Sequence, residues 1–170
     1  MEFLELAKKR YSCRSLSDRP VPQELLDRII EAGLAAPTAV NKQPIHIWLL
    51  ASDAAKEAVH AVTHCTFGAE VFLLVGCRPE EAWVRSYDGK NFAEVDGAIA
   101  ATHMMLEIEA LGLATTWVGH FDAPKLKAIY PELADETLIA IFPVGYAADD
   151  AAPSERHGQR KTPCEAVTVL

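Results

Sequence analysis

The sequence predicts a mixed β-sheet flanked by helices, within one domain that spans residues 1–170. Segments with helical and strand periodicity follow one another without a repeat or a linker. The continuous apolar run over residues 69–77 is typical of a strand at the centre of a sheet. The chain has 170 residues, of which 50% are hydrophobic, so it can bury a substantial core. A Rossmann fold is the first alternative, but neither its glycine fingerprint nor a P-loop motif occurs.

The first half of the chain alternates between predicted helices and strands. Residues 2–9 predict a short helix, and residues 22–36 predict a longer one that is bounded by prolines. Residues 45–51 are rich in Ile, Trp and Leu, which is typical of a strand. Ser52 is a good N-cap, so a helix is expected from there to about residue 64.

The second half of the chain begins with the longest predicted helix. Residues 92–111 are apolar on nearly every side, so this helix is expected to be central and buried, with Gly112 as its C-cap. The remaining predicted elements are a strand over 114–118, a helix over 122–130, a strand over 137–147 and a strand-like run over 166–170.

The charge balance of the chain argues against two classes of binding partner. With 16 basic and 24 acidic side chains, the formal net charge is −8, and no basic stripe occurs. Because binding to nucleic acid depends on Lys and Arg, this composition argues against nucleic acid and against a membrane surface. A local basic pocket for a small anionic ligand remains compatible with it.

The cysteines and the N-terminus favour a cytoplasmic location. The four cysteines are widely spaced and form no C-x-x-C motif, which argues against a zinc ribbon or an iron–sulfur cluster. Acidic residues stand where a signal peptide carries positive charge. The longest apolar stretch, over residues 95–118, contains His103, Glu107 and Glu109, so no membrane span is expected.

Two basic clusters are candidates for anion binding. In an extended segment, Arg10, Ser12 and Arg14 point to the same side, where they can converge on a phosphate. The run over residues 156–161 is the densest basic stretch of the chain and can complete such a pocket. Solvated arginines at a helix end and a solvated charge run are the alternatives.

Two further segments are candidates for binding a flat heterocycle. Asn41 and Gln43 carry amides that both donate and accept, although an ordinary polar loop is the alternative. Gly119 lets backbone approach a flat ligand closely, although helix capping and core packing also explain residues 112–121. His60 and His64 have metal-ligand spacing but lack an evident third ligand, so no metal is expected.

Together, five segments in order resemble the nitroreductase family of FMN-dependent oxidoreductases. They are residues 10–14, 36–44, 96–101 leading into 111–119, 143–146 and 160–163. The resemblance spans nearly the whole chain. It implies an α+β nitroreductase-like fold with a mixed, mainly antiparallel central sheet flanked by helices. It also implies an intertwined homodimer with two FMN sites at its interface.

The resemblance assigns roles to residues of this chain. Arg10, Ser12 and Arg14 are expected at the FMN phosphate and ribityl chain, helped by Arg160 or Lys161. The segment 37–41 is expected to reach the isoalloxazine of the other subunit, and backbone at Val118 and Gly119 to lie near flavin N5. The full expected set for the cofactor is Arg10, Tyr11, Ser12, Arg14, Pro37, Thr38, Ala39, Asn41, Gln43, Thr116, Trp117, Val118, Gly119, Arg160 and Lys161.

The implied function is passage of a hydride from NAD(P)H through flavin N5 to a small-molecule acceptor such as a nitro compound or a quinone. Because the flavin carries the chemistry, no catalytic side chain is expected. Trp83, Tyr87 and Phe92 are candidates for the acceptor pocket, with core packing as the alternative. Reductive dehalogenation, flavin destruction, a non-catalytic FMN-binding module and a structural domain without flavin are the other hypotheses.

Overall fold

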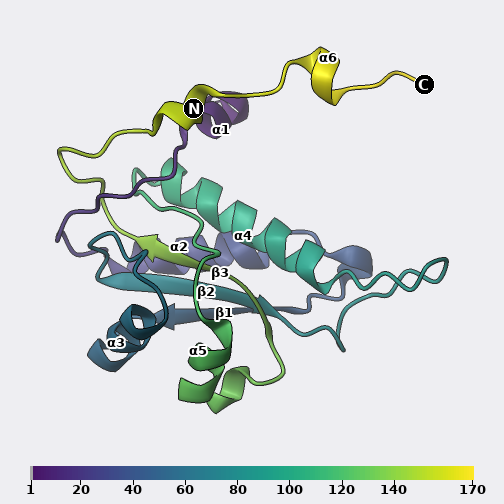
Figure 1. Ribbon diagram of the computed structural model, residues 1–170, viewed down its shortest axis with the longest axis horizontal. Coiled ribbons are helices and arrows are strands. Elements are labelled where there is room, and N and C mark those ends of the chain that lie inside the picture. The colour runs from purple at the N-terminus through teal and green to yellow at the C-terminus, as the bar shows by residue number, and fades with distance from the viewer. Residues whose placement is uncertain (1) are drawn as a thin grey trace.

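The centre of the molecule is an antiparallel sheet of three strands in the order β1-β2-β3 (Figure 1). The computed structural model describes residues 2–170. The strands are β1 (Ile45–Leu50), β2 (Val71–Cys77) and β3 (Thr137–Val144). Every residue of β2 is buried, so the prediction of a central strand from its apolar run is confirmed.

Helices cover both faces of the sheet, which gives an α+β fold of three layers (Figure 1). The helices are α1 (Phe3–Lys9), α2 (Gln23–Leu34), α3 (Asp53–Val62), α4 (Ala93–Ala110), α5 (Ala123–Ile129) and α6 (Pro163–Ala166). Side chains of β2 alternate between the faces. Leu73 belongs to the core formed with α2 and α4, whereas Phe72 and Leu74 belong to the core with α3 and α5. The helices therefore hold the sheet rigid from both sides.

Two caps that the sequence predicts are confirmed. The side chain of Ser52 accepts a hydrogen bond from Ala55 N at the start of α3. Gly112 follows α4 with φ of +72°, a backbone conformation that glycine adopts without a steric penalty.

Residues 114–118 do not form the strand that the sequence predicts. They contact β3 through two isolated bridges, Ala114 with Gly145 and Val118 with Ile141. This register sets Thr116 opposite Pro143, which has no N–H to donate. Thr115 Oγ1 donates instead to Pro143 O at 2.7 Å. The proline thus interrupts the ladder and leaves irregular backbone at this point.

The expected parallel component of the sheet is also absent from the described part of the chain, where all strand pairs and isolated bridges are antiparallel. The cause lies between α4 and β3. After α4, residues 114–118 run antiparallel to β3 and therefore in the same direction as β2. The chain then reverses through α5, so β3 runs in the direction opposite to β2.

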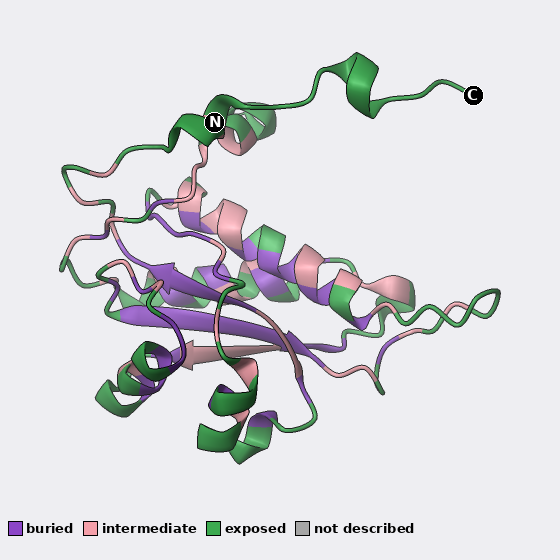
Figure 2. Ribbon diagram, in the orientation of Figure 1, coloured by how far each residue is buried: buried purple, intermediate pink, exposed green. Residues whose placement is uncertain are grey.

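Residues 148–170 form a C-terminal tail that leaves the body of the molecule, and Figure 2 shows most of this tail exposed. The strand-like run over 166–170 is not a strand in this structure. Its first residue, Ala166, ends the short helix α6, which has a capping box between Thr162 and Glu165. Val169 and Leu170 are fully solvent-exposed, at 93% and 115%. A strand needs a neighbour for its backbone hydrogen bonds, and the described residues bring none to residues 167–170.

Within residues 2–170, no helix combines the length and the apolarity needed to cross a bilayer.

Candidate functional site

A basic cavity of about 230 Å³ lies between the segment after α1 and the C-terminal tail. Its lining residues are Arg10, Tyr11, Ser12, Arg14, Ser154, Arg156, His157 and Arg160. None of these four arginines forms a salt bridge within residues 2–170. Four guanidinium groups without a carboxylate partner repel one another, and guanidinium geometry matches phosphate. The cavity is therefore suited to a multiply charged anion.

Local contacts hold the two walls of this cavity in place. Cys13 is fully buried, and its N–H donates to Thr115 O at 2.9 Å, which fixes the segment against the core. Ser15 Oγ donates to Asp150 Oδ1 at 2.9 Å, which ties the segment to the start of the tail. The rings of Tyr11 and His157 meet edge-to-face, with centroids 6.3 Å apart. Burial, with a smaller contribution from Cys13, raises the pKa of Tyr11.

The tail residues that line the basic cavity differ from those that the sequence predicts. Arg160 lines the cavity, and its guanidinium donates to the carbonyls of His157 and Gln159 at 2.6 and 2.8 Å. Lys161 is not among the lining residues. Arg156 and His157 lie in the same basic run but were not among the expected cofactor residues. The 3-10 turn over Glu155–Gly158 turns them toward the cavity, and turn geometry is not visible in the charge pattern.

A second hollow of about 120 Å³ adjoins the first and shares Arg14 with it. Its other lining residues are Cys65, Phe67, Thr116, Trp117, Val118, Gly119 and His120. The predicted segment 116–119 thus lies beside Arg14. Val118 exchanges both of its backbone hydrogen bonds with Ile141, but Pro143 cannot pair with Thr116, so the backbone polar groups of Thr116, Trp117 and Gly119 are available to a ligand. A basic cavity continuous with a strip of free backbone suits a molecule with an anionic end and a flat polar ring.

The predicted ring-binding segment 37–43 lies elsewhere. It directly precedes Ile45, which pairs with Cys77 at one end of β2. The basic cavity lies near the other end, where Val71 pairs with Val144 and Ala114 bridges the next residue. Seven strand residues span roughly 20 Å. Pro37, Thr38, Ala39, Asn41 and Gln43 are therefore not brought together with the arginines within one chain.

The three candidate acceptor-pocket aromatics do not converge on one cavity. Trp83 and Phe92 pack on each other, with ring centroids 5.1 Å apart, and Lys90 lies over the Phe92 ring. Tyr87 sits at the tip of the intervening turn and is 95% exposed. Core packing thus describes Trp83 and Phe92, whereas the side chain of Tyr87 is free to contact a ligand.

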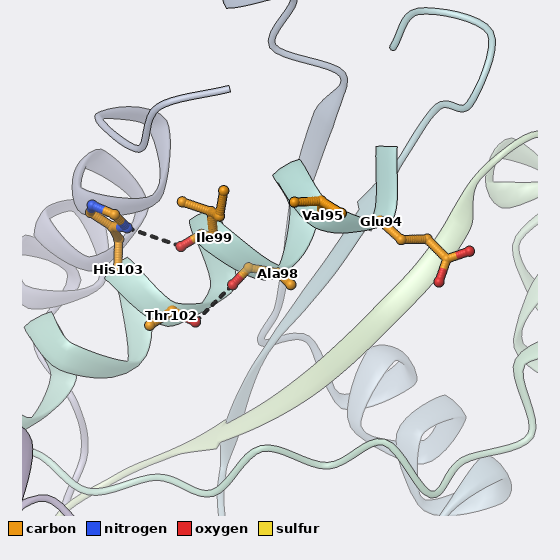
Figure 3. Close-up of a pocket in the computed structure, with 6 residues that line it drawn as sticks. All are labelled: Glu94, Val95, Ala98, Ile99, Thr102 and His103. Atoms are coloured by element: carbon orange, nitrogen blue, oxygen red, sulfur yellow. Dashed lines mark hydrogen bonds between the residues drawn. The ribbon is translucent and has the colours of Figure 1, made fainter. Parts of the chain in front are cut away.

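The sequence predicts that helix α4 is buried on nearly every side, but one side of it is not covered. A hollow of about 490 Å³ runs along its outer side, lined by Glu94, Val95, Ala98, Ile99, Thr102 and His103 (Figure 3). Thr102 Oγ1 and His103 Nδ1 bond back to the carbonyls of Ala98 and Ile99. The sequence predicts that this side of the helix is buried, and residues 2–170 do not cover it.

Comparison with known proteins identifies relatives over most of the chain. The model of the Nitroreductase family matches residues 7–67 and 64–146. A nitroreductase family protein from Clostridium difficile has a similar structure, with a TM-score of 0.91 and 32% identity, over 99% of this chain and 98% of that one. A nitroreductase from Desulfovibrio desulfuricans, solved in complex with FMN, has a TM-score of 0.83 and 26% identity, over 100% and 97% of the two chains. A Methanothermobacter thermautotrophicus protein named NADH dehydrogenase/NAD(P)H nitroreductase is 27% identical, over 88% of this chain and 80% of the relative.

Proposed function

Because the chain belongs to the nitroreductase family, we propose that it is an FMN-dependent NAD(P)H oxidoreductase acting on small-molecule acceptors. The observation that carries the proposal is the cavity of four unpaired arginines, which continues through Arg14 into the unbonded backbone of Thr116, Trp117 and Gly119. FMN has the matching shape and charge, with a phosphate at one end and a flat polar ring at the other. Similar proteins bind FMN or carry NAD(P)H in their names.

The donor set fits the cofactor. Arg10, Arg156 and Arg160 line the first cavity and would hold the phosphate, to which the Ser12 hydroxyl would add a neutral donor. Arg14 lines both hollows, so it would hold the ribityl chain or the ring edge. When bound, FMN accepts a hydride at N5 and passes reducing equivalents to an acceptor such as a nitro compound or a quinone. The chain contributes binding and orientation, with backbone at Val118 and Gly119 close to the ring.

We further propose an intertwined homodimer in which each FMN site uses both chains. The segment 37–43 lies at the opposite end of the sheet from the basic cavity, so a second copy has to bring it to the flavin. The apolar outer side of α4 and the exposed tail favour the same arrangement, because burying them removes apolar surface from water (Figures 2 and 3). In this proposal residues 1–170 are one FMN-binding domain, and its four unbridged cysteines favour the reducing cytoplasm.

The test is an absorption spectrum of the purified protein, before and after anaerobic addition of NADH and, separately, of NADPH. A flavin spectrum that bleaches within seconds supports the oxidoreductase and identifies its donor. Protein that shows no flavin after incubation with FMN contradicts the proposal. A control without nucleotide under the same illumination excludes photoreduction.

A non-catalytic FMN-binding module is the second candidate, and it is favoured by the open site. It predicts bound flavin that stays oxidised with both nucleotides but is reduced by dithionite. Acceptor-dependent NAD(P)H oxidation by the holoprotein would contradict it.

A further inference from the structure

Asp96 is a buried carboxylate that the cofactor contacts proposed above do not use. It lies in the first turn of α4 and is 1% exposed. Its Oδ1 accepts a hydrogen bond from Ala39 N at 2.9 Å. Its Oδ2 is buried without a hydrogen-bond partner among the described residues, and no ion pair within residues 2–170 involves it. Burying a carboxylate with one partner is unfavourable, so a compensating role is expected.

The segment that Asp96 contacts has an unfavourable backbone. Val40, Asn41 and Gln43 all have positive φ, of 45°, 57° and 52°. For a β-branched residue such as Val40 this conformation is a true outlier, and such strain persists only where surrounding contacts impose it.

Few contacts are available to impose this conformation. The other hydrogen bonds of residues 38–43 stay inside the segment, for example from Gln43 N to Thr38 Oγ1 at 2.9 Å. In the described chain, the bond from Ala39 N to Asp96 is the one that ties this segment to the rest of the molecule. The carboxylate thus acts as an external anchor for a strained turn.

Asp96 is itself held at a fixed place on the sheet. A Cβ at its neighbour Gly97 would lie 3.0 Å from Ile139 Cγ1, so α4 approaches β3 more closely here than a larger residue allows. Asp96 N donates to Phe92 O at 2.9 Å within the helix. The position of the carboxylate is therefore set by the core, and the turn takes its position from the carboxylate.

We propose that Asp96 is a positioning residue that holds the turn over residues 38–43 in the conformation that contacts the flavin ring. The second half of this inference rests on the proposed function, in which this turn reaches the cofactor of the other subunit. Asp96 touches neither cofactor nor substrate; it acts through Ala39. It therefore affects recognition of the ring and leaves recognition of the phosphate to the arginines.

The first experiment needs no flavin. Hydrogen–deuterium exchange of peptides over residues 38–44 is compared between the wild-type protein, Asp96→Ala and Asp96→Asn. We expect exchange to accelerate at least about tenfold in Asp96→Ala, because a bond to a charged acceptor is lost. Asp96→Asn keeps an acceptor oxygen and is expected to stay within about threefold of wild type. Wild-type exchange in Asp96→Ala would overturn the anchoring role.

The second experiment measures the affinity of FMN and of riboflavin, which lacks the phosphate. Asp96→Ala is expected to weaken both ligands by the same factor, about tenfold or more, whereas Arg156→Ala weakens FMN selectively. Met104→Ala, which opens a cavity in the core side of α4, is the control for lost stability alone. Equal losses in Met104→Ala and Asp96→Ala would reduce Asp96 to a structural residue.

The two experiments separate two kinds of failure. Wild-type protein that binds neither flavin contradicts the proposed function, while the exchange data still decide whether Asp96 holds the turn. Wild-type protein that binds flavin, with unchanged riboflavin affinity in Asp96→Ala and accelerated exchange, would show that the turn does not contact the ring.

Discussion

Arg14 is the residue shared by the two hollows of the candidate site. Its guanidinium donates to Ser12 O at 3.2 Å and has no carboxylate partner within residues 2–170. A guanidinium that pairs with no acid of its own chain is available to an anionic ligand. This distinguishes Arg14 from Arg85, which pairs with Asp88, and from Arg78, which pairs with Glu81 and Glu136.

Arg14→Ala is expected to weaken FMN binding about tenfold or more, because a charge-assisted hydrogen bond to the ligand is lost. Flavin fluorescence quenching on titration with protein measures the change. Lys161→Ala is the matched control, because the Lys161 side chain does not line the cavity. The FMN affinity of this variant should stay near that of the wild-type protein. Unchanged FMN affinity in Arg14→Ala would place the ligand elsewhere.

Cys77 predicts how stability depends on alkaline pH. Burial, followed by the nearby carboxylates of Glu94, Glu136 and Asp96, raises its pKa from 9.0 to about 12. Above pH 9 the unfolded chain ionises this thiol while the folded chain does not, so the folded state loses stability as pH rises toward 12. The loss is expected to approach about 1.4 kcal/mol per pH unit.

The measurement is urea unfolding of wild type and Cys77→Ala at several pH values between 7 and 11. Lys and Tyr residues titrate in the same range, but they contribute equally to both proteins and cancel in the difference. We expect the two curves to run parallel below pH 9 and wild type to fall faster above it. Parallel curves throughout would contradict the raised pKa of Cys77.

At the scale of single elements, apolar periodicity and caps allowed most of the fold to be predicted. The central position of β2 follows from its unbroken apolar run, and the start of α3 follows from Ser52. Residues 114–118 have the same strand-like composition, but Pro143 stands opposite Thr116 and interrupts pairing. A pairing partner distant in sequence is not contained in a local pattern, and this is why the predicted strand over 114–118 is absent.

The same limit applies to the candidate site. The alternation of Arg10, Ser12 and Arg14 in an extended segment was enough to predict a basic pocket, and the structure contains one. The contribution of Arg156 and His157 depends on a 3-10 turn, and the anchoring of Ala39 by Asp96 depends on a contact across the fold. Side chains that meet through tertiary packing leave no spacing in the sequence.

The bond that replaces the missing ladder pair is expected to be important for stability. Thr115 is 5% exposed, and its hydroxyl donates to Pro143 O at 2.7 Å. Thr115→Val keeps the shape but leaves a buried carbonyl without its donor, which costs about 1–3 kcal/mol. Denaturant unfolding measures the loss. Thr162→Val removes an exposed hydroxyl bond and should cost less than about 0.5 kcal/mol, so similar losses in both variants would count against this explanation.

At the scale of the whole molecule, the unmatched surfaces of one chain have complementary positions. The turn over residues 38–43 and the basic cavity lie at opposite ends of the sheet. In the proposed dimer, a second copy related by a twofold axis would bring the turn of one chain to the cavity of the other. The same symmetry would let the hollow along the outer side of α4, which Figure 3 shows for one chain, be covered by α4 of the second copy. The proposed assembly would thus account for both the divided site and the uncovered side of α4.

Ala98→Arg tests this assembly. Ala98 lies on the outer side of α4, where an arginine is accommodated in a single chain but places a charge in a helix–helix interface. The control is Ala54→Arg, on the exposed side of α3. Light scattering should give about twice the chain mass of 18.6 kDa for the wild-type protein and for this control. It should give the single-chain mass for Ala98→Arg. If each flavin site uses both chains, as proposed, the single chain should also lose FMN while its far-ultraviolet circular dichroism stays native. A wild-type monomer with full flavin content would contradict the shared site, and a dimeric Ala98→Arg would place the interface on another face.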